Sequence, residues 1–367
     1  MTTISEELTA KIAQKFFFET HIYSNVFYVD DDGEKELCDV LIEFVDFYVC
    51  IEVKEKNKSS TSDDWTWFNN KVLHKGIKQA KKAINSIKQA TTKFYIELED
   101  KKKKYLDIDS GKSIIPLIVF YNCQCDNNNK FFEADSLNHP INIFSYEDFC
   151  IMLNTIIIPY DIVGYLLQRS EYIPQQGGKR VIFEDLTDDI TLLSAPQTEK
   201  DYAEMYLVKN YYSQDISPEY ISFYNEFLSN IYNNYGSAVP ELFEMLFSAD
   251  TILANRIVAY YCSTLERLKS KEWDVPLFAY NKSDCGIMFT RKPFLSTNEE
   301  FDNYLNNFCT YFAFKHNLGK IYALLFVNAT EDTFTISIGG CKFNPALFDA
   351  ELEATIKEID KKFGIDA

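Results

Sequence analysis

The chain has 367 residues, of which 46% are hydrophobic and 16% aromatic, so it can fill the cores of one large or two ordinary domains and is not a disordered protein. Its formal net charge of -18 argues against a protein that binds nucleic acid through overall basicity, because such proteins neutralise phosphates with a surplus of lysine and arginine. The apolar runs are too short to cross a bilayer and no secretory signal opens the chain, so we expect a cytoplasmic protein without membrane contact.

The first predicted element is a helix over residues 5–18. Ser5 is a suitable N-cap, and apolar residues follow at helical spacing, namely Leu8, Ile12, Phe16 and Phe17. Glu6 and Glu7 lie in the first turn of this helix. A short strand over residues 25–29 comes next and turns back into the following segment.

The segment from Glu36 to Lys54 predicts a hairpin that carries two acids and a lysine. Side chains alternate across a strand, so Glu52 and Lys54 share one face while the valines and isoleucine around them share the other. A short connection would bring Asp39, on the first strand, towards Glu52 on the second. Two carboxylates can hold a hard divalent cation, and a lysine beside them can orient an attacking water.

A polar loop over residues 55–62 and a helix over residues 67–90 follow the hairpin. One face of this helix is apolar, and the opposite face carries four lysines, here named the lysine stripe: Lys71, Lys75, Lys78 and Lys82. Gln79 lies at the border of the two faces. Between Lys71 and Lys104 the chain has 11 lysines against 3 acids, so a basic region follows the candidate site in an otherwise acidic chain. The alternative for the stripe and for Gln79 is an ordinary solvated helix face. The run of lysines at 101–104 is expected to be an exposed loop.

Two apolar strands, over residues 114–121 and 141–144, and two helices, over residues 145–156 and 159–169, complete the first half, which is therefore α/β. Proline and glycine then predict a linker over residues 173–199, and residues 1–172 form the predicted N-terminal domain. Residues 200–367 predict an α+β domain of helices at 217–236, 240–268, 296–316 and 345–363, with strands at 276–280, 286–290, 320–328 and 333–338. This second domain is rich in aromatic residues and has no catalytic motif, which favours recognition or oligomerisation.

The motif Asp39…Glu52-Val53-Lys54 resembles that of the PD-(D/E)xK nuclease superfamily over roughly the first 170 residues. The resemblance implies a restriction-endonuclease-like αβββαβ core with a mixed sheet, in which Asp39 and Glu52 bind Mg²⁺, or Mn²⁺ in its place, and Lys54 is catalytic. It also implies that Glu6 or Glu7 from the first helix and Gln79 from the later helix join the site. Cys38 stands where the family usually has a proline before the aspartate.

We therefore expect a metal-dependent nuclease that hydrolyses phosphodiester bonds in DNA. The lysine stripe would hold the backbone of the DNA. The resemblance leaves restriction, repair and defence against invading DNA open as the process that it serves, and analogy with similar architectures favours bacterial antiphage defence over replication. The C-terminal domain would contact a partner subunit or a second copy of the chain. One alternative is a nuclease fold that has lost catalysis and serves as a DNA-binding or assembly subunit. A second is an acidic protein that mimics DNA, which would need an exposed array of acids rather than one pocket. DNA and RNA, and endo- and exonuclease action, stay open.

Overall fold

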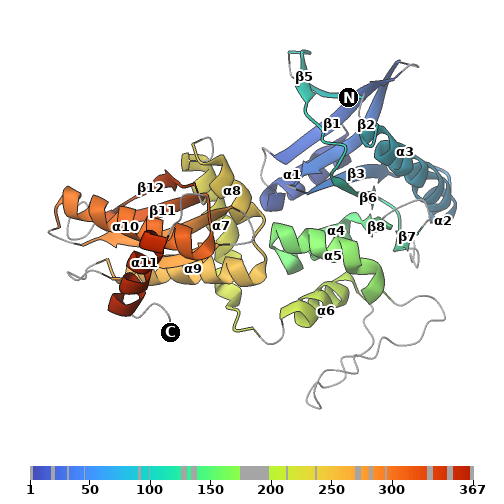
Figure 1. Ribbon diagram of the computed structural model, residues 1–367. Helices are drawn as coiled ribbons and strands as arrows, with labels where there is room; N and C mark the ends of the chain where they lie inside the picture. The colour runs from blue at the N-terminus through green and yellow to red at the C-terminus, as the bar shows by residue number, and fades with distance from the viewer. Residues whose placement is uncertain are drawn as a thin grey trace. The chain divides into compact units, whose positions relative to one another are not determined.

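The computed structural model of the chain describes residues 3–17, 21–30, 33–44, 46–89, 92–98, 100–124, 130–133, 139–173, 198–211, 214–235, 238–268, 274–280, 284–293, 296–328, 334–344 and 350–363. The chain divides into two compact units, Met1–Tyr212 and Ser213–Ala367. Both units combine helices with a sheet, as Figure 1 shows, and the predicted α/β class is confirmed. Within the described residues, no helix is both long enough and apolar enough to cross a membrane.

Unit 1 is built on a mixed sheet that, in its described part, has the strand order β5-β4-β1-β2-β3-β6-β8-β7. Strands β3, β6 and β8 are parallel, and the other pairs are antiparallel. The elements of the unit are α1 (Ile4–Phe17), β1 (Ile22–Asp30), β2 (Gly33–Glu43), β3 (Phe47–Glu55), α2 (Asp64–Phe68), the π-helix η2 (Asn69–Gly76), α3 (Ile77–Ile87), β4 (Lys93–Glu97), β5 (Lys103–Leu106), β6 (Ser113–Tyr121), β7 (Phe131–Phe132), β8 (Ile141–Ser145), α4 (Tyr146–Ile156), α5 (Pro159–Tyr172) and α6 (Glu199–Tyr211). The order α1-β1-β2-β3-α3-β6 is the predicted αβββαβ order with β4 and β5 inserted before β6.

Strands β2 and β3 form the predicted hairpin. Leu41 lies opposite Cys50, and the last paired residues towards the open end are Val40 and Ile51. The connection is closed by a hydrogen bond of 2.8 Å from the Phe44 N–H to the carbonyl of Phe47. Beyond Val40, β2 stays paired with β1, and beyond Ile51, β3 stays paired with β6. The two strands therefore separate where the motif residues begin.

Helices α1 and α3 cover opposite faces of this hairpin (Figure 1). Residues of α3 pack in one core cluster with Leu41 and Cys50. Ser5 of α1 reaches Glu55, whose side chain points to the other face because strand side chains alternate. The buried face of α1 differs from the predicted one, since Leu8 is 40% exposed while smaller residues are buried, among them Thr9, Ala10 and Ala13. Glu52 and Lys54 share the face of Cys50, so they lie on the side that α3 covers.

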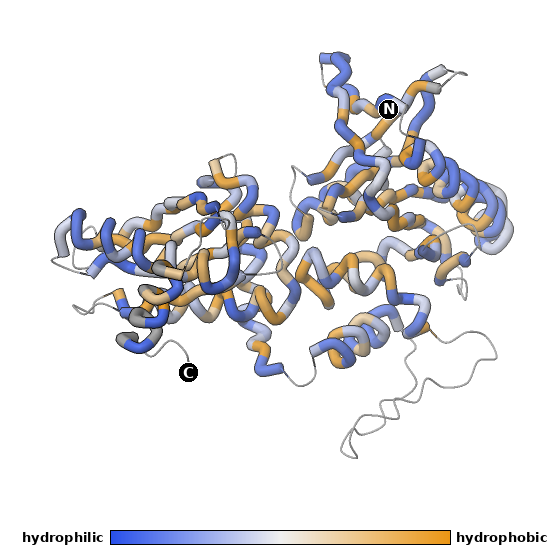
Figure 2. The backbone as a smooth tube through the Cα atoms, in the orientation of Figure 1, coloured by the Kyte–Doolittle hydropathy of each residue, from blue (hydrophilic) through white to orange (hydrophobic). Residues whose placement is uncertain are grey.

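The helix predicted at 67–90 is continuous but changes type along its length. Residues 69–76 are π-helical, with the α-helices α2 before and α3 after them. Gly76 lies so close to β6 that an added Cβ would be 3.0 Å from Cδ1 of Ile118. All four lysines of the stripe are exposed, as predicted. Figure 2 shows hydrophilic and hydrophobic residues interspersed along this helical segment.

The lysine run at 101–104 is not wholly a loop, because its second half begins the edge strand β5. Lys103 forms an ion pair with Glu34, and its ammonium lies 4.2 Å from the centre of the Tyr95 ring. Lysines on an edge strand discourage pairing with another chain, so this part of the basic region has a structural role of its own.

The division between the units lies further along the chain than the predicted linker, of which residues 174–197 lie outside the described residues. Helix α6, predicted to belong to the C-terminal domain, packs on α4 and α5 in unit 1. Its first residue, Glu199, pairs with Arg169 of α5 at 2.7 Å, and both side chains are fully buried. Tyr165 also donates a hydrogen bond of 2.7 Å to Glu199. A buried ion pair of this kind fixes α6 to unit 1.

Unit 2 has a sheet with the described strand order β12-β11-β10-β9, in which β10 and β11 are parallel. Its elements are α7 (Pro218–Tyr235), α8 (Pro240–Phe247), α9 (Thr251–Glu266), β9 (Leu277–Tyr280), β10 (Cys285–Lys292), α10 (Asn298–His316), β11 (Lys320–Asn328), β12 (Phe334–Lys342) and α11 (Ala350–Phe363). The helix predicted at 240–268 is two helices, because Asp250 caps the start of α9 through the Leu253 N–H. Aromatic residues fill the core, as the fully buried Tyr224 illustrates.

Candidate functional site

The acid pair lies where β2 and β3 separate. Asp39 and Glu52 each lie one position beyond the last paired residues, Val40 and Ile51, towards the open end of the hairpin. They therefore face each other across the opening. The Asp39 carboxylate accepts a hydrogen bond of 2.6 Å from the Val53 N–H, which replaces the main-chain bond that the ladder would otherwise make. Asp39 is 6% exposed and Glu52 is 3% exposed. Two neighbouring carboxylates are thus withdrawn from water.

Lys54 provides the positive charge next to this pair. Its ammonium donates a hydrogen bond of 2.9 Å to Glu52 Oε2 and another of 3.0 Å to the carbonyl of Val53. The side chain of Lys54 is 12% exposed, so the interaction is only partly screened by solvent. The structure thus brings Asp39, Glu52 and Lys54 together, as the sequence predicts.

The pKa values of both carboxyl groups are raised. Burial raises the pKa of Asp39 to about 8, and the negative charge of Glu52 adds to the rise. Lys54 and the Val53 N–H oppose this rise without cancelling it. Burial likewise raises the pKa of Glu52, against the pull of Lys54. Near neutral pH the pair therefore retains a proton, which a cation would have to displace.

Two further charged residues, which the sequence did not assign to the site, change the pKa values of the acid pair. The negative charge of Glu36 raises the pKa of both Asp39 and Glu52, and Lys75 of the lysine stripe lowers that of Glu52. Glu36 precedes an irregularity in β2, because Val26 pairs with Cys38 whereas the next residue of β1 pairs with Glu36. This bulge shifts the alternation of side chains along β2. No sequence signal marks it, although Glu36 opens the motif segment.

Among the described residues, no interaction joins the two acids of the first helix, Glu6 and Glu7, to the acid pair. Glu6 accepts a hydrogen bond of 2.7 Å from the Thr3 N–H, and Glu7 is exposed. The α1 residue that reaches the end of β3 is Ser5, whose hydroxyl donates to Glu55 at 2.9 Å. Neither glutamate is brought to Asp39 by an interaction of the described residues, so their place in the site stays a prediction.

Gln79 and Lys82 line a cavity beside the acid pair. The cavity has a volume of about 270 Å³ and lies between β2 and α3, with the lining residues Lys35, Glu36, Leu37, Gln79, Lys82 and Ala83. Leu37 of this lining lies on β2 two residues before Asp39, so the cavity lies next to the acid pair, and Glu36 of the same lining raises the pKa of both acids. Gln79 Oε1 is buried and accepts no hydrogen bond within the described part of the chain. Lys71 and Lys78 are exposed on the helix and do not line the cavity.

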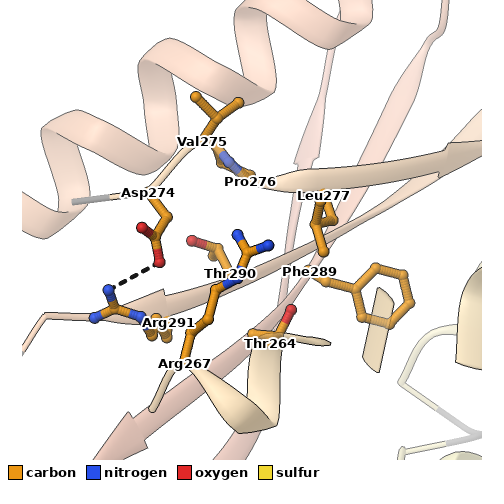
Figure 3. Close-up of a pocket in the computed structure, with 9 residues that line it drawn as sticks. All are labelled: Thr264, Arg267, Asp274, Val275, Pro276, Leu277, Phe289, Thr290 and Arg291. Atoms are coloured by element: carbon orange, nitrogen blue, oxygen red, sulfur yellow. Dashed lines mark hydrogen bonds and ion pairs between the residues drawn. The ribbon is translucent and has the colours of Figure 1, made fainter. Parts of the chain in front are cut away.

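Unit 2 has a pocket of a different kind (Figure 3). Its volume is about 10 Å³, which is about the room that one water needs. Asp274 and Arg291 face each other at its edge and form an ion pair of 2.9 Å. Tyr304 donates a hydrogen bond to the carbonyl of Asp274, which holds that residue in place. Because the pocket has room for about one water and Asp274 is already paired with Arg291, we assign no site to it.

The donors around Asp39 suit Mg²⁺ only in part. Among the described residues, no three side chains of histidine, cysteine, aspartate or glutamate gather as a cation site. Two carboxylates are present, and Mg²⁺ commonly binds proteins through one or two carboxylates while keeping several waters and contacting substrate phosphates. The Val53 carbonyl, which Lys54 contacts, is a further oxygen beside Glu52. The chain thus fits a cation that is completed by water and substrate.

Comparison with models of protein families, with curated proteins and with solved structures finds no match to this chain. The case for a function therefore depends on the residues of the acid pair and on their surroundings.

Proposed function

We propose that unit 1 is a metal-dependent nuclease that hydrolyses phosphodiester bonds in DNA. The observation that carries the proposal is the placement of Asp39, Glu52 and Lys54 in one partly closed opening between two strands. Two buried carboxylates with raised pKa values cost folding stability, and such groups are concentrated at functional sites. The exposed lysine stripe on α3 and η2 supplies a surface of the opposite charge beside this opening.

Each residue of the site has a role that follows from its position. Asp39 and Glu52 would hold Mg²⁺, for which Mn²⁺ can substitute, and this ion would supply a water of lowered pKa and neutralise the negative charge of the phosphate. Lys54 already donates to Glu52 and can instead donate to a phosphate oxygen or to the attacking water. The hydrogen bond from the Val53 N–H holds one carboxylate oxygen of Asp39, Oδ2, in place.

A second candidate function is a nuclease fold without catalysis that serves as a DNA-binding or assembly subunit. It is favoured by the presence of two acids instead of a larger cluster among the described residues. In that case Lys54 would neutralise Glu52 permanently, and the lysine stripe would still bind DNA. The same cleavage assay separates the two candidates.

The test is cleavage of labelled single- and double-stranded DNA and RNA by the full chain with Mg²⁺, with Mn²⁺ and with EDTA. We expect cleavage that needs the metal and that falls at least about 100-fold in Asp39→Asn, Glu52→Gln and Lys54→Met, in line with the loss of one catalytic group. The control is Glu55→Gln, because Glu55 is an acid at the end of the same strand that instead bonds Ser5 and Asn122. Equal rates in parent and Asp39→Asn would refute catalysis at this site, and DNA binding without any cleavage would select the second candidate.

A further inference from the structure

Two cysteines of unit 2 meet between a helix and a strand of the sheet. Cys309 lies on α10, and Cys341 lies near the end of β12. Cys341 is paired with Ile321 of β11, and partners across two strands point to the same face of a sheet. Ile321 and Cys309 belong to one core cluster, against which Cys341 packs. The side chain of Cys341 therefore lies on the face of the sheet that α10 covers.

The two thiols interact with each other, and their exposure differs. A hydrogen bond between them is the main cause that lowers the pKa of Cys341 and raises that of Cys309. Cys309 is 2% exposed, whereas Cys341 is partly open to solvent. The sulfur that solvent reaches is thus the one that ionises more readily, and the thiolate is the form of cysteine that oxidants attack. The buried thiol lies directly behind it.

Another cysteine of the same unit shows that exposure alone does not give a thiol this property. Cys262 on α9 is also partly open to solvent. Burial raises the pKa of its thiol, and the negative charge of Glu266 adds to the rise. The interaction with a second thiol therefore distinguishes Cys341 from Cys262.

We propose that Cys341 and Cys309 are an oxidation site for hydroperoxides, in which Cys341 is oxidised first and Cys309 then forms a disulfide with it. The Cys341 thiolate attacks one oxygen of the hydroperoxide, the O–O bond breaks, and the products are a sulfenic acid and water or an alcohol. The Cys309 sulfur next attacks the Cys341 sulfur, the S–O bond breaks, and the proton of Cys309 leaves with the hydroxide as water. Two electrons pass from the two thiols to the hydroperoxide.

The disulfide would tie α10 to β12, an edge strand in the described part of the sheet. Such a link restricts the unfolded chain and fixes the helix on the sheet. The inference goes beyond the nuclease function proposed for unit 1 and does not depend on it.

The experiment treats the reduced full chain in EDTA with a small excess of hydrogen peroxide. Remaining thiols are blocked with N-ethylmaleimide, and peptide mass spectrometry locates the disulfides. We expect a peptide pair joined through Cys309 and Cys341 that dithiothreitol separates. Cys341→Ser and Cys309→Ser should lose this pair, and the matched control Cys262→Ser should keep it.

The order of the two steps is tested with dimedone, which captures sulfenic acids. In Cys309→Ser the sulfenic acid of Cys341 cannot be resolved, while the serine hydroxyl still offers a hydrogen bond to the sulfur. Dimedone should therefore label Cys341 at least about threefold more than Cys262 in the same sample. Thermal unfolding of the reduced variants checks that they fold, and the test on the parent chain does not depend on any variant.

Three results would overturn the inference. The first is a parent chain in which peroxide produces no link between Cys309 and Cys341. The second is equal labelling of Cys341 and Cys262 by dimedone in folded Cys309→Ser. The third is labelling of Cys309 in folded Cys341→Ser as strong as that of Cys341 in Cys309→Ser, because the buried sulfur would then be oxidised first just as readily.

Discussion

At the scale of single residues, the motif could be predicted from the sequence, but its electrostatics could not. Alternation along a strand placed Glu52 and Lys54 on one face, and the hairpin brought Asp39 opposite them. The sequence does not reveal that the Val53 N–H leaves the ladder to bond Asp39, nor that Glu36 approaches the pair. Both follow from the separation of β2 from β3 and from the bulge in β2, which depend on strand pairing far along the chain.

The raised pKa of Asp39 predicts how stability depends on pH. Its value in the folded protein is about 8, well above that of an unfolded aspartate, so the folded state holds the extra proton between about pH 4 and pH 8. The free energy of unfolding of the metal-free protein therefore falls as pH rises through this window, by at most about 1.4 kcal/mol per pH unit from this group. Asp39→Asn should flatten that dependence and should be more stable than the parent at about pH 8.

Urea unfolding in EDTA, followed over this pH range, measures the difference. Asparagine keeps an oxygen for the Val53 N–H, so the fold should survive the change. The control is Glu55→Gln, whose dependence on pH should match that of the parent. If the parent and Asp39→Asn have the same slope of unfolding free energy against pH, the carboxyl of Asp39 does not carry the proton assigned to it.

At the scale of elements, the amphipathic pattern predicted the helix and its exposed lysines, but not its π-helical part. The π-helical part, η2, ends at Gly76, which lies against Ile118 of β6, 42 positions later in the chain. Nothing local in the sequence encodes that contact. The same limit applies to β5, because its lysines suggest a loop until β4 is present to pair with it.

The contact between Gly76 and Ile118 can be tested by a double-mutant cycle. Alanine at position 76 gains up to about 1 kcal/mol of helix propensity but places its Cβ 3.0 Å from Cδ1 of Ile118. Ile118→Val removes that atom. Gly76→Ala should therefore raise the unfolding free energy more in the Ile118→Val background than in the parent, by about 1 kcal/mol. Additive effects in urea unfolding would show that the close approach does not restrict position 76.

The lysine stripe should bind the phosphate backbone without reading bases. Ammonium groups on flexible chains act as point charges, so replacing Lys71, Lys75, Lys78 and Lys82 by glutamine should weaken binding to all duplex sequences alike. The slope of log K against log salt should decrease by about 0.9 for each contact that is lost. The measurement is fluorescence anisotropy with duplex DNA in EDTA. Replacing the exposed Lys11 and Lys15 of α1 is the control, and an equal change of slope per lysine there would show that the stripe is not special.

At the scale of the whole molecule, two compact units could be predicted from composition, whereas their boundary could not. Proline and glycine in the chain marked residues 173–199, yet the division lies at Tyr212 and Ser213. The reason is a contact between residues 30 positions apart, in which the guanidinium of Arg169 meets the carboxylate of Glu199 inside unit 1. Side-chain pairing across such a distance leaves no trace in local composition.

The boundary predicts how fragments of the chain behave. A fragment of residues 1–172 lacks α6, so it loses both the ion pair of Arg169 with Glu199 and the packing of α6 on α4 and α5, at a cost of about 3–5 kcal/mol. A fragment of residues 1–212 keeps the pair and should fold with a higher Tm than the shorter one. If thermal unfolding gives the two fragments the same Tm, α6 does not belong to unit 1. Comparing cleavage and mass of fragment 1–212 with the full chain then shows whether the C-terminal domain provides recognition or self-association, as proposed.

The measurement that tests the central claim most directly is a titration of the full chain with Mn²⁺, in which electron paramagnetic resonance counts the bound ions. The account expects at least one Mn²⁺ site per chain whose affinity rises with pH from about 6 to 9, because the cation must displace the proton shared by the acid pair. This site should be lost in Asp39→Asn and in Glu52→Gln and kept in Glu55→Gln. If Mn²⁺ binds Asp39→Asn as tightly as it binds the parent, the two buried carboxylates are not a metal site and the proposed nuclease centre is contradicted.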